Sequence, residues 1–139
     1  MESLSILDLN GKTAILNGGE GLHTIEEYVW KSLFNNKKEI VVIDDLYNQP
    51  EKIKLVIDCD NIILSTTGEY ADDLKKVTDA FEKLNYAPKI VIFITYDTAD
   101  ILCDVARRFK KNGTKFYSFD SPEDYDGIQY NTLHKINWI

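Results

Sequence analysis

Five short apolar runs, four rich in β-branched residues and the last in aromatic ones, recur along this 139-residue chain and constrain its fold more than any other feature. The runs are continuous rather than alternating, which is typical of strands buried on both faces of a sheet. Amphipathic helical stretches fill the gaps, so strands and helices alternate along the chain. This order predicts an α/β fold of three layers, Rossmann-like or flavodoxin-like, with a five-stranded parallel sheet and helices on both faces. The predicted strands are residues 12–17, 39–44, 61–66, 89–95 and 115–120.

Helices are predicted wherever apolar residues recur every three or four positions. Such stripes cover residues 25–33, 71–84 and 101–109. Pro50 suits the first turn of a shorter helix that extends to about Ile57. The crossovers between the parallel strands should be right-handed.

The chain is predicted to form one domain over residues 1–139, because its length is ordinary for a domain and no linker or low-complexity tract interrupts it. Residues 121–139 form an aromatic-rich C-terminal extension, which begins with turn-forming residues and then becomes apolar. This extension could be an added strand, a docking helix or a subunit contact. A homodimer, or a protein partner held through the extension, is therefore one expected association.

The charge balance argues against one class of partner. The chain has 16 basic and 23 acidic residues and a formal net charge of −7, which disfavours binding to a nucleic-acid backbone.

No secretory signal is evident, and the longest strictly apolar run, Ile90–Ile94, is too short to span a membrane. We expect a cytoplasmic protein without a membrane partner. Cys59 and Cys103 lack the spacing of a zinc site, so no metal site is predicted.

Polar residues or glycines follow every predicted strand. In open parallel sheets, ligands bind at the carboxyl ends of the strands, where the strand order reverses. A polar cleft and the capping of the following helices require the same residue types, so both interpretations stay open for the hydroxyl residues. The residues predicted at this edge are Asn17 to Gly21, Asp44 and Asp45, Ser65 to Gly68, Thr95 to Asp97, and Asp120.

A glycine-rich segment, Asn17-Gly18-Gly19-Glu20-Gly21-Leu22-His23-Thr24, lies between the first predicted strand and the first predicted helix. Glycines at such a turn let backbone N–H groups approach a phosphate. The segment resembles the Gly-Gly-x-Gly turn of nucleotide-sugar epimerases and other extended short-chain dehydrogenases. Residues 40–48 resemble that family's second strand with its ribose-binding acid. The resemblance covers residues 12–48 and implies a nucleotide-binding βαβ unit.

The resemblance implies specific contacts. The glycines would hold a diphosphate, and Asp44, which lies 26 residues after Gly18, would accept ribose hydroxyls. No basic residue follows Asp44 directly, so the resemblance favours NAD over NADP as the cofactor. A nucleotide-sugar is the other expected ligand, since the segment is also similar to small nucleotide-sugar-binding domains attached to sugar acyltransferases. Together with two hydroxyl residues of the expected edge, the predicted cofactor-binding residues are Gly18, Gly19, Gly21, Asp44, Thr66 and Thr67.

We predict a domain that binds a nucleotide, dinucleotide or nucleotide-sugar without independent catalysis. The family's catalytic Tyr-x-x-x-Lys pair is absent from the sequence, so no catalytic residue is assigned. Glu20 in the loop, and Thr24 where the third glycine would stand, depart from the family pattern. They favour the alternative of a ligand-free interaction domain with the same fold. A less favoured alternative is a haloacid-dehalogenase-like phosphatase. Its first motif resembles the pair Asp58 and Asp60, which follows Lys54-Leu55-Val56-Ile57.

Overall fold

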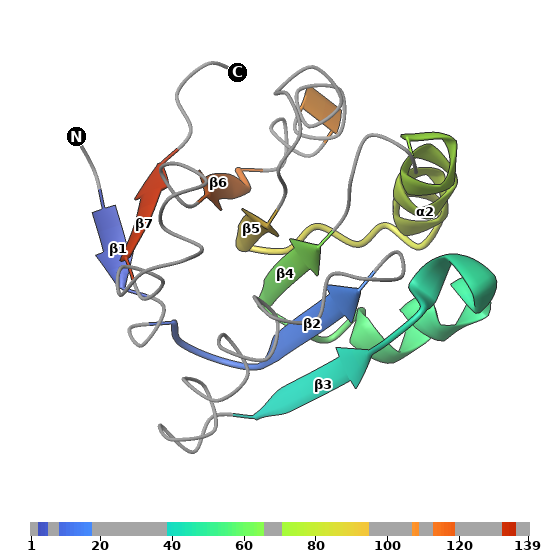
Figure 1. The fold of residues 1–139 in the computed structure, drawn as a ribbon, viewed down its shortest axis with the longest axis horizontal. Helices are drawn as coiled ribbons and strands as arrows, with labels where there is room; N and C mark the ends of the chain where they lie inside the picture. Colours follow the sequence, from blue (N-terminus) through green and yellow to red (C-terminus); the bar gives the residue numbers. More distant parts are fainter. Residues whose placement is uncertain are drawn as a thin grey trace.

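A computed structural model describes residues 3–5, 9–17, 39–65, 71–94, 107–108, 113–118 and 132–135 of the chain. The described strands form one seven-stranded sheet (Figure 1). They are β1 (Ser3–Ser5), β2 (Thr13–Asn17), β3 (Ile40–Ile43), β4 (Asn61–Ser65), β5 (Ile90–Ile94), β6 (Lys115–Ser118) and β7 (Thr132–Lys135). The α-helix α2 (Ala71–Lys83) and the 3₁₀ helices η2 (Leu46–Asn48) and η3 (Pro50–Val56) lie between strands.

The sheet has the order β1-β7-β6-β5-β4-β2-β3. The strands β2 to β6 pair in parallel, which confirms the predicted α/β fold with five parallel strands. Their order, numbered among these five along the chain, is second, first, third, fourth, fifth, which is the flavodoxin-like topology of the two predicted. The strand order therefore reverses at β2, with β3 on one side of it and every later parallel strand on the other.

The predicted helices are confirmed where the structure describes them. The stripe at residues 71–84 corresponds to α2, and the short helix begins at Pro50 as predicted, although its geometry is 3₁₀. The stripe at residues 25–33 lies outside the described residues, and residues 107 and 108 are the described part of the stripe at 101–109. Within the described ranges, every helix is too short or too polar to cross a bilayer.

One face of the parallel strands packs against α2, η2 and η3 (Figure 1). Successive residues of a strand point to opposite faces, so every second residue joins this core. Leu74, Val77 and Phe81 recur at helical spacing along the buried side of α2. Each large side chain buried in this way stabilises the fold by roughly 1.5–3 kcal/mol. The strand residues of the core are Ala14, Leu16, Ile43, Ile62, Leu64, Val91, Phe93 and Phe116.

The central strands are buried on the opposite face as well. Ile15, Ile63 and Ile92 alternate with the core residues and are at most 1% exposed. A strand that is covered on both sides needs apolar residues at successive positions, which explains why the sequence runs are continuous. On this second face, β2 and β4 carry polar side chains at their two ends.

Part of the C-terminal extension completes the sheet. Strand β7 lies between β6 and β1 and runs antiparallel to both. Of the arrangements left open for the extension, residues 132–135 therefore adopt the added strand. Within β7, residues 134 and 135 pair with β6, and residues 132–134 pair with β1. Among the described strands, β1 and β3 form the outer edges.

Asp60 joins the amino-terminal ends of three parallel strands. Its N–H donates to the carbonyl oxygen of Lys12 at 2.9 Å, and its carbonyl oxygen accepts the N–H of Lys89 at 2.8 Å. Its carboxylate accepts the N–H of Lys12 at 3.3 Å and lies 3.3 Å from Lys89 Nζ. Gly11 has a φ of +85°, and a Cβ at that position would collide with this carboxylate. These contacts fix the starts of β2, β4 and β5 relative to one another.

Candidate functional site

The point of strand-order reversal lies between β2 and β4. Asn17 is the last residue of β2, Ser65 is the last residue of β4, and the two are register partners on neighbouring parallel strands. Their side chains therefore lie next to each other on the same face, at the edge where open α/β sheets bind ligands. Asn17 is 5% exposed and Ser65 is 0% exposed. The reversal point is thus marked by two buried polar side chains.

Asp44 fixes the orientation of the Asn17 amide. Asp44 directly follows β3, and its Oδ1 accepts a hydrogen bond of 2.6 Å from Asn17 Nδ2. An ionised carboxylate accepts hydrogen bonds and donates none. The amide nitrogen must therefore face Asp44, and the amide oxygen must face away from it. The orientation of Asn17 follows from the chemical identity of residue 44.

Two buried atoms at the reversal point lack a hydrogen-bond partner, namely Asn17 Oδ1 and Ser65 Oγ. In the part of the chain that the structure describes, no other buried side-chain nitrogen or oxygen atom is in this state. A buried polar atom left unpaired costs roughly 1–3 kcal/mol, so folded proteins rarely keep one that nothing else satisfies. The two unpaired atoms belong to register partners, so their side chains lie next to each other on one face of the sheet.

At the amino-terminal ends of the same two strands, the buried polar side chains are hydrogen-bonded. Thr13 and Asn61 are register partners on the same face and are buried. Asn61 Nδ2 donates to the carbonyl oxygen of Asn10 at 2.8 Å and to Thr13 Oγ1 at 3.3 Å. The buried polar side chains at this end therefore bond within the protein, whereas Asn17 and Ser65 keep unpaired atoms.

The Asp44 carboxylate is held toward β2 by local contacts. Its Oδ1 also accepts the N–H of Asp45 at 3.0 Å, and the Asp44 carbonyl oxygen accepts a hydrogen bond of 3.1 Å from Gln49 Nε2. Asp45 adopts the left-handed backbone conformation with a φ of 53°, which turns the chain from the end of β3 into η2. Asp44 itself is exposed, so its carboxylate lies at the surface beside two buried groups.

The structure places one predicted cofactor-binding residue at the expected edge. This residue is Asp44, which lies in hydrogen-bonding contact with the end of β2. Asn17 and Ser65 belong to the edge predicted from the sequence, but not to the predicted cofactor-binding set. The signal that could have selected them was a polar residue at the end of an apolar run. The other predicted cofactor-binding residues lie outside the described residues: Gly18, Gly19, Gly21, Thr66 and Thr67.

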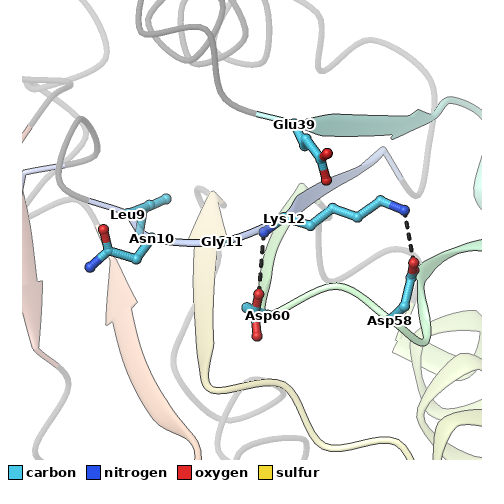
Figure 2. A pocket seen from close by; sticks show the side chains of 7 residues that line it. All are labelled: Leu9, Asn10, Gly11, Lys12, Glu39, Asp58 and Asp60. Carbon is cyan, nitrogen blue, oxygen red and sulfur yellow. Dashed lines mark hydrogen bonds and ion pairs between the residues drawn. The ribbon is translucent and has the colours of Figure 1, made fainter.

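A pocket of about 590 Å³ lies at the opposite, amino-terminal edge of the strands (Figure 2). Two of its acids contact Lys12: Lys12 Nζ lies 2.9 Å from Asp58 Oδ2, and the carboxylate of Asp60 accepts the backbone N–H of Lys12. The hydrogen bond between Lys12 and Asp58 raises the pKa of Lys12 and lowers the pKa of Asp58. Because these groups pair within the pocket, we assign the candidate site to the carboxyl edge.

The phosphatase alternative is wrong. It requires Asp58 and Asp60 to follow a strand, whereas the residues before them form η3 and the turn after it. Both acids precede β4 and so lie at the amino-terminal edge of the sheet. The described ranges also contain no group of three or more His, Cys, Asp or Glu side chains that could hold a metal ion.

No protein-family model matches the chain, and no curated protein matches it in sequence. Among solved structures, a cobalamin-binding protein from Desulfitobacterium hafniense DCB-2 is similar, with a TM-score of 0.50 and 17% sequence identity. The similarity covers 84% of this chain and 57% of that one, so this chain spans little more than half of its length. The Trp repressor binding protein from Bacillus subtilis has a TM-score of 0.47 and 15% identity, over 81% of this chain and 88% of that one. The topology and the first similarity together define a flavodoxin-like α/β fold.

Proposed function

We propose that the domain binds a nucleotide-class ligand, such as NAD or a nucleotide-sugar, at the carboxyl edge between β2 and β4. The observation that carries this proposal is the pair of buried, unpaired atoms at the reversal point, Asn17 Oδ1 and Ser65 Oγ. Such atoms destabilise the unliganded fold, and a ligand group that hydrogen-bonds to both removes that cost. Open α/β sheets bind their ligands at this point of the strand order.

The arrangement of β2 and β3 supports a nucleotide as the ligand. The two strands are parallel neighbours, and Asp44 follows the second of them. The acid that accepts ribose hydroxyls stands at this position in the nucleotide-sugar epimerases that residues 12–48 resemble. In our proposal, Asp44 accepts ribose hydroxyls and the segment Gly18–Gly21 holds the phosphates through backbone N–H groups. Thr66 and Thr67, which directly follow Ser65, complete the binding set.

We propose binding without independent catalysis. The amide of Asn17 and the hydroxyl of Ser65 do not ionise near neutral pH, so they recognise a ligand through hydrogen bonds rather than by exchanging protons with it. The sequence lacks the Tyr-x-x-x-Lys pair that supplies acid–base chemistry in the family that residues 12–48 resemble. The domain would then hold a ligand for use by another protein or report its presence.

A thermal-shift screen tests the proposal. The panel contains ADP, UDP, NAD, UDP-glucose and FMN, together with cobalamin, because one similar structure is that of a cobalamin-binding protein. A ligand present at 100 times its dissociation constant stabilises the folded state by about 2.7 kcal/mol, which a melting experiment resolves. We expect at least one nucleotide of the panel to raise the melting temperature. A panel in which no nucleotide raises it would refute the proposed function.

Two matched variants assign the ligand to one edge of the sheet. Asp44→Ala removes a carboxylate at the carboxyl edge, and Lys12→Ala removes a cation from the pocket at the amino-terminal edge. We expect the ligand-induced shift, measured against each variant's own unliganded melt, to disappear in Asp44→Ala and to persist in Lys12→Ala. The reverse result would move the binding site to the opposite edge.

A further inference from the structure

We propose that Asn17 and Ser65 form a subsite for one hydroxyl group of the ligand, and that Asp44 sets the hydrogen-bonding polarity of this subsite through the Asn17 amide. The inference rests on the proposed nucleotide-binding function and names the ligand group that meets the ends of β2 and β4. The subsite consists of Asn17 Oδ1 and Ser65 Oγ, which belong to register partners and have no partner within the protein.

The two atoms have complementary requirements. Asn17 Oδ1 can only accept a hydrogen bond, whereas Ser65 Oγ has one proton to donate. A ligand hydroxyl satisfies both at once, because it donates its proton to Asn17 Oδ1 and accepts the proton of Ser65. An ionised phosphate oxygen accepts from Ser65, but it has no proton to donate to the Asn17 oxygen, which is also an acceptor. An aromatic amino group donates to Asn17 but is a poor acceptor for Ser65. Water has the same dual capacity as a hydroxyl and is the competitor that a ligand must displace.

Asp44 determines which end of the Asn17 amide the subsite presents. The hydrogen bond of 2.6 Å from Asn17 Nδ2 to Asp44 Oδ1 keeps the amide oxygen on the other side. An asparagine at position 44 has both a donor and an acceptor, so the Asn17 amide can turn over and present its NH₂ group instead. Toward this subsite Asp44 is thus a positioning residue, in addition to its proposed direct contact with ribose. Asp44→Asn therefore changes which end of the Asn17 amide can face the subsite, with almost no change in the size of the side chain at position 44.

Burial makes the subsite selective. Both side chains are at least nine-tenths buried, so a ligand that lacks the hydroxyl leaves two polar atoms unpaired and away from bulk water. Sites built to bond a ligand hydroxyl reject the analogue that lacks it for this reason. A ribose presents two adjacent hydroxyls, and the Asp44 carboxylate beside Asn17 favours a neutral group of this kind over a phosphate at the buried position.

Calorimetric titration of the whole chain with matched nucleotides tests the subsite. ADP and UDP are compared with their 2′,3′-dideoxy forms, and IDP replaces the adenine amino group. We expect the dideoxy forms to bind at least about tenfold more weakly and IDP to bind like ADP, since the recognised donor is a sugar hydroxyl. A loss with IDP and none with the dideoxy form would assign the subsite to the base and overturn the inference.

Two hydroxyl deletions on the same face provide the matched variants. Ser65→Ala removes an unpaired hydroxyl, so the unliganded protein should melt at the same or a higher temperature, while the preference for ADP over dideoxy-ADP falls below that of the parent protein. Thr13→Val removes a hydroxyl that accepts a hydrogen bond from Asn61, so the protein should melt at a lower temperature with the preference unchanged. In Asp44→Asn, the affinities of 2′-fluoro- and 3′-fluoro-ADP should rise relative to ADP, because fluorine can accept but cannot donate.

The outcomes separate the inference from the proposed function. Equal binding of ADP and dideoxy-ADP by the parent protein would overturn the hydroxyl subsite and leave nucleotide binding intact. Failure of every nucleotide to bind would overturn both. A melting temperature that falls as far in Ser65→Ala as in Thr13→Val would show that the Ser65 hydroxyl stabilises the unliganded fold, and would also overturn the subsite.

Discussion

The carboxylate of Asp60 occupies the space that a side chain on Gly11 would need. Gly11 leads into β2 with a φ of +85°, and Asp60 precedes β4 while accepting the N–H of Lys12. The close approach is open only to a residue without a Cβ. The contact lies where β2 and β4 begin, and the parallel register of the two strands pairs Asn17 with Ser65 at their far ends.

Gly11→Ala should destabilise the fold strongly, and Gly113→Ala provides the control. Both glycines have a positive φ, so each substitution has a backbone cost of about 1–3 kcal/mol. A Cβ on Gly113 meets nothing within 4 Å, whereas a Cβ on Gly11 meets the Asp60 carboxylate. We expect Gly11→Ala to lower the free energy of unfolding, measured in urea, by roughly 1–3 kcal/mol more than Gly113→Ala does. Equal losses would show that Asp60 moves aside without cost.

The strands were predictable because their composition matches their environment. Residues of β2 and β4 are apolar at successive positions, since both faces of these strands are buried, and polar residues end both runs. The order of the strands was not predictable in the same way. The strand order depends on the side of β2 to which each crossover returns the chain, and no local sequence pattern indicates that side. Rossmann-like and flavodoxin-like topologies therefore remained equally compatible with the sequence.

Residues 55–57 show where a short apolar run misleads. Three such residues fit a strand or a helix equally well, and the strand interpretation led to the phosphatase alternative. In η3, Ile53 and Val56 are buried, whereas Leu55 and the following Ile57 are 59% and 47% exposed. The buried pair is spaced by three residues, and Pro50 begins the helix. The prediction of this helix rested on Pro50, and the spacing of the buried pair in the structure agrees with it.

The position of the candidate site was predictable from the sequence, but the hydrogen bonding of its side chains was not. Asn17, Asp44 and Ser65 follow or end strands, so their place at the carboxyl edge follows from a parallel sheet. That Asn17 bonds Asp44 through its nitrogen, and that its oxygen and the Ser65 hydroxyl remain unpaired, depends on the exact pairing of three strands. Such contacts join residues that are distant in the chain, and residue types alone do not report them.

Asp44→Ala should lower the stability of the unliganded protein as well as remove the proposed ligand contact. The substitution deprives the buried Asn17 Nδ2 of its acceptor, which costs about 1–3 kcal/mol in the free energy of unfolding. Asn48→Ala is the control, because it removes a hydrogen bond of 2.8 Å to Asp45 between exposed groups. We expect a change within about 0.5 kcal/mol for the control. A urea titration in which the two variants lose equally would contradict the buried role of the Asn17 amide.

Stability should fall in alkaline solution through Cys59. Burial raises the pKa of its thiol from an ordinary value of 9.0 to about 11. The contribution of this group is therefore fully present below pH 9, where both states are protonated, and is lost as the pH rises toward 11, because the unfolded chain releases the proton first. Burial also raises the pKa of Tyr86, whose hydroxyl donates to the Cys59 carbonyl oxygen at 2.9 Å.

Cys59→Ala isolates the thiol from the tyrosine. Between pH 9 and 11, we expect the free energy of unfolding to fall more steeply in the parent than in Cys59→Ala, with the remaining slope of the variant attributable to Tyr86 and other groups. Alkylation of Cys59 in the folded protein should accordingly stay slow at pH 9, since the thiolate is the reactive form. Parallel stability curves for the two proteins would contradict the raised pKa.

Removal of β7 should release β1 as well. A chain that ends at Asn131 lacks the strand that pairs with both β6 and β1, so residues 3–5 lose the partners they have in the sheet. We expect a lower melting temperature and faster hydrogen exchange at the backbone amides of residues 3–5, measured by mass spectrometry. Unchanged exchange at these amides, with the parent's melting temperature, would show that the pairing contributes nothing to the fold.

The pairing of β1 with β7 also determines the order in which parts of the sheet can form during synthesis. Residues 3–5 pair with a strand that is synthesised more than a hundred residues after them. At roughly 5–20 residues per second, the early segment waits on the order of ten seconds for its neighbour. The parallel strands from β2 to β5 can assemble during that interval, whereas the antiparallel edge forms last. A nascent chain stalled before residue 132 should therefore carry a formed parallel core, with residues 3–5 still unpaired.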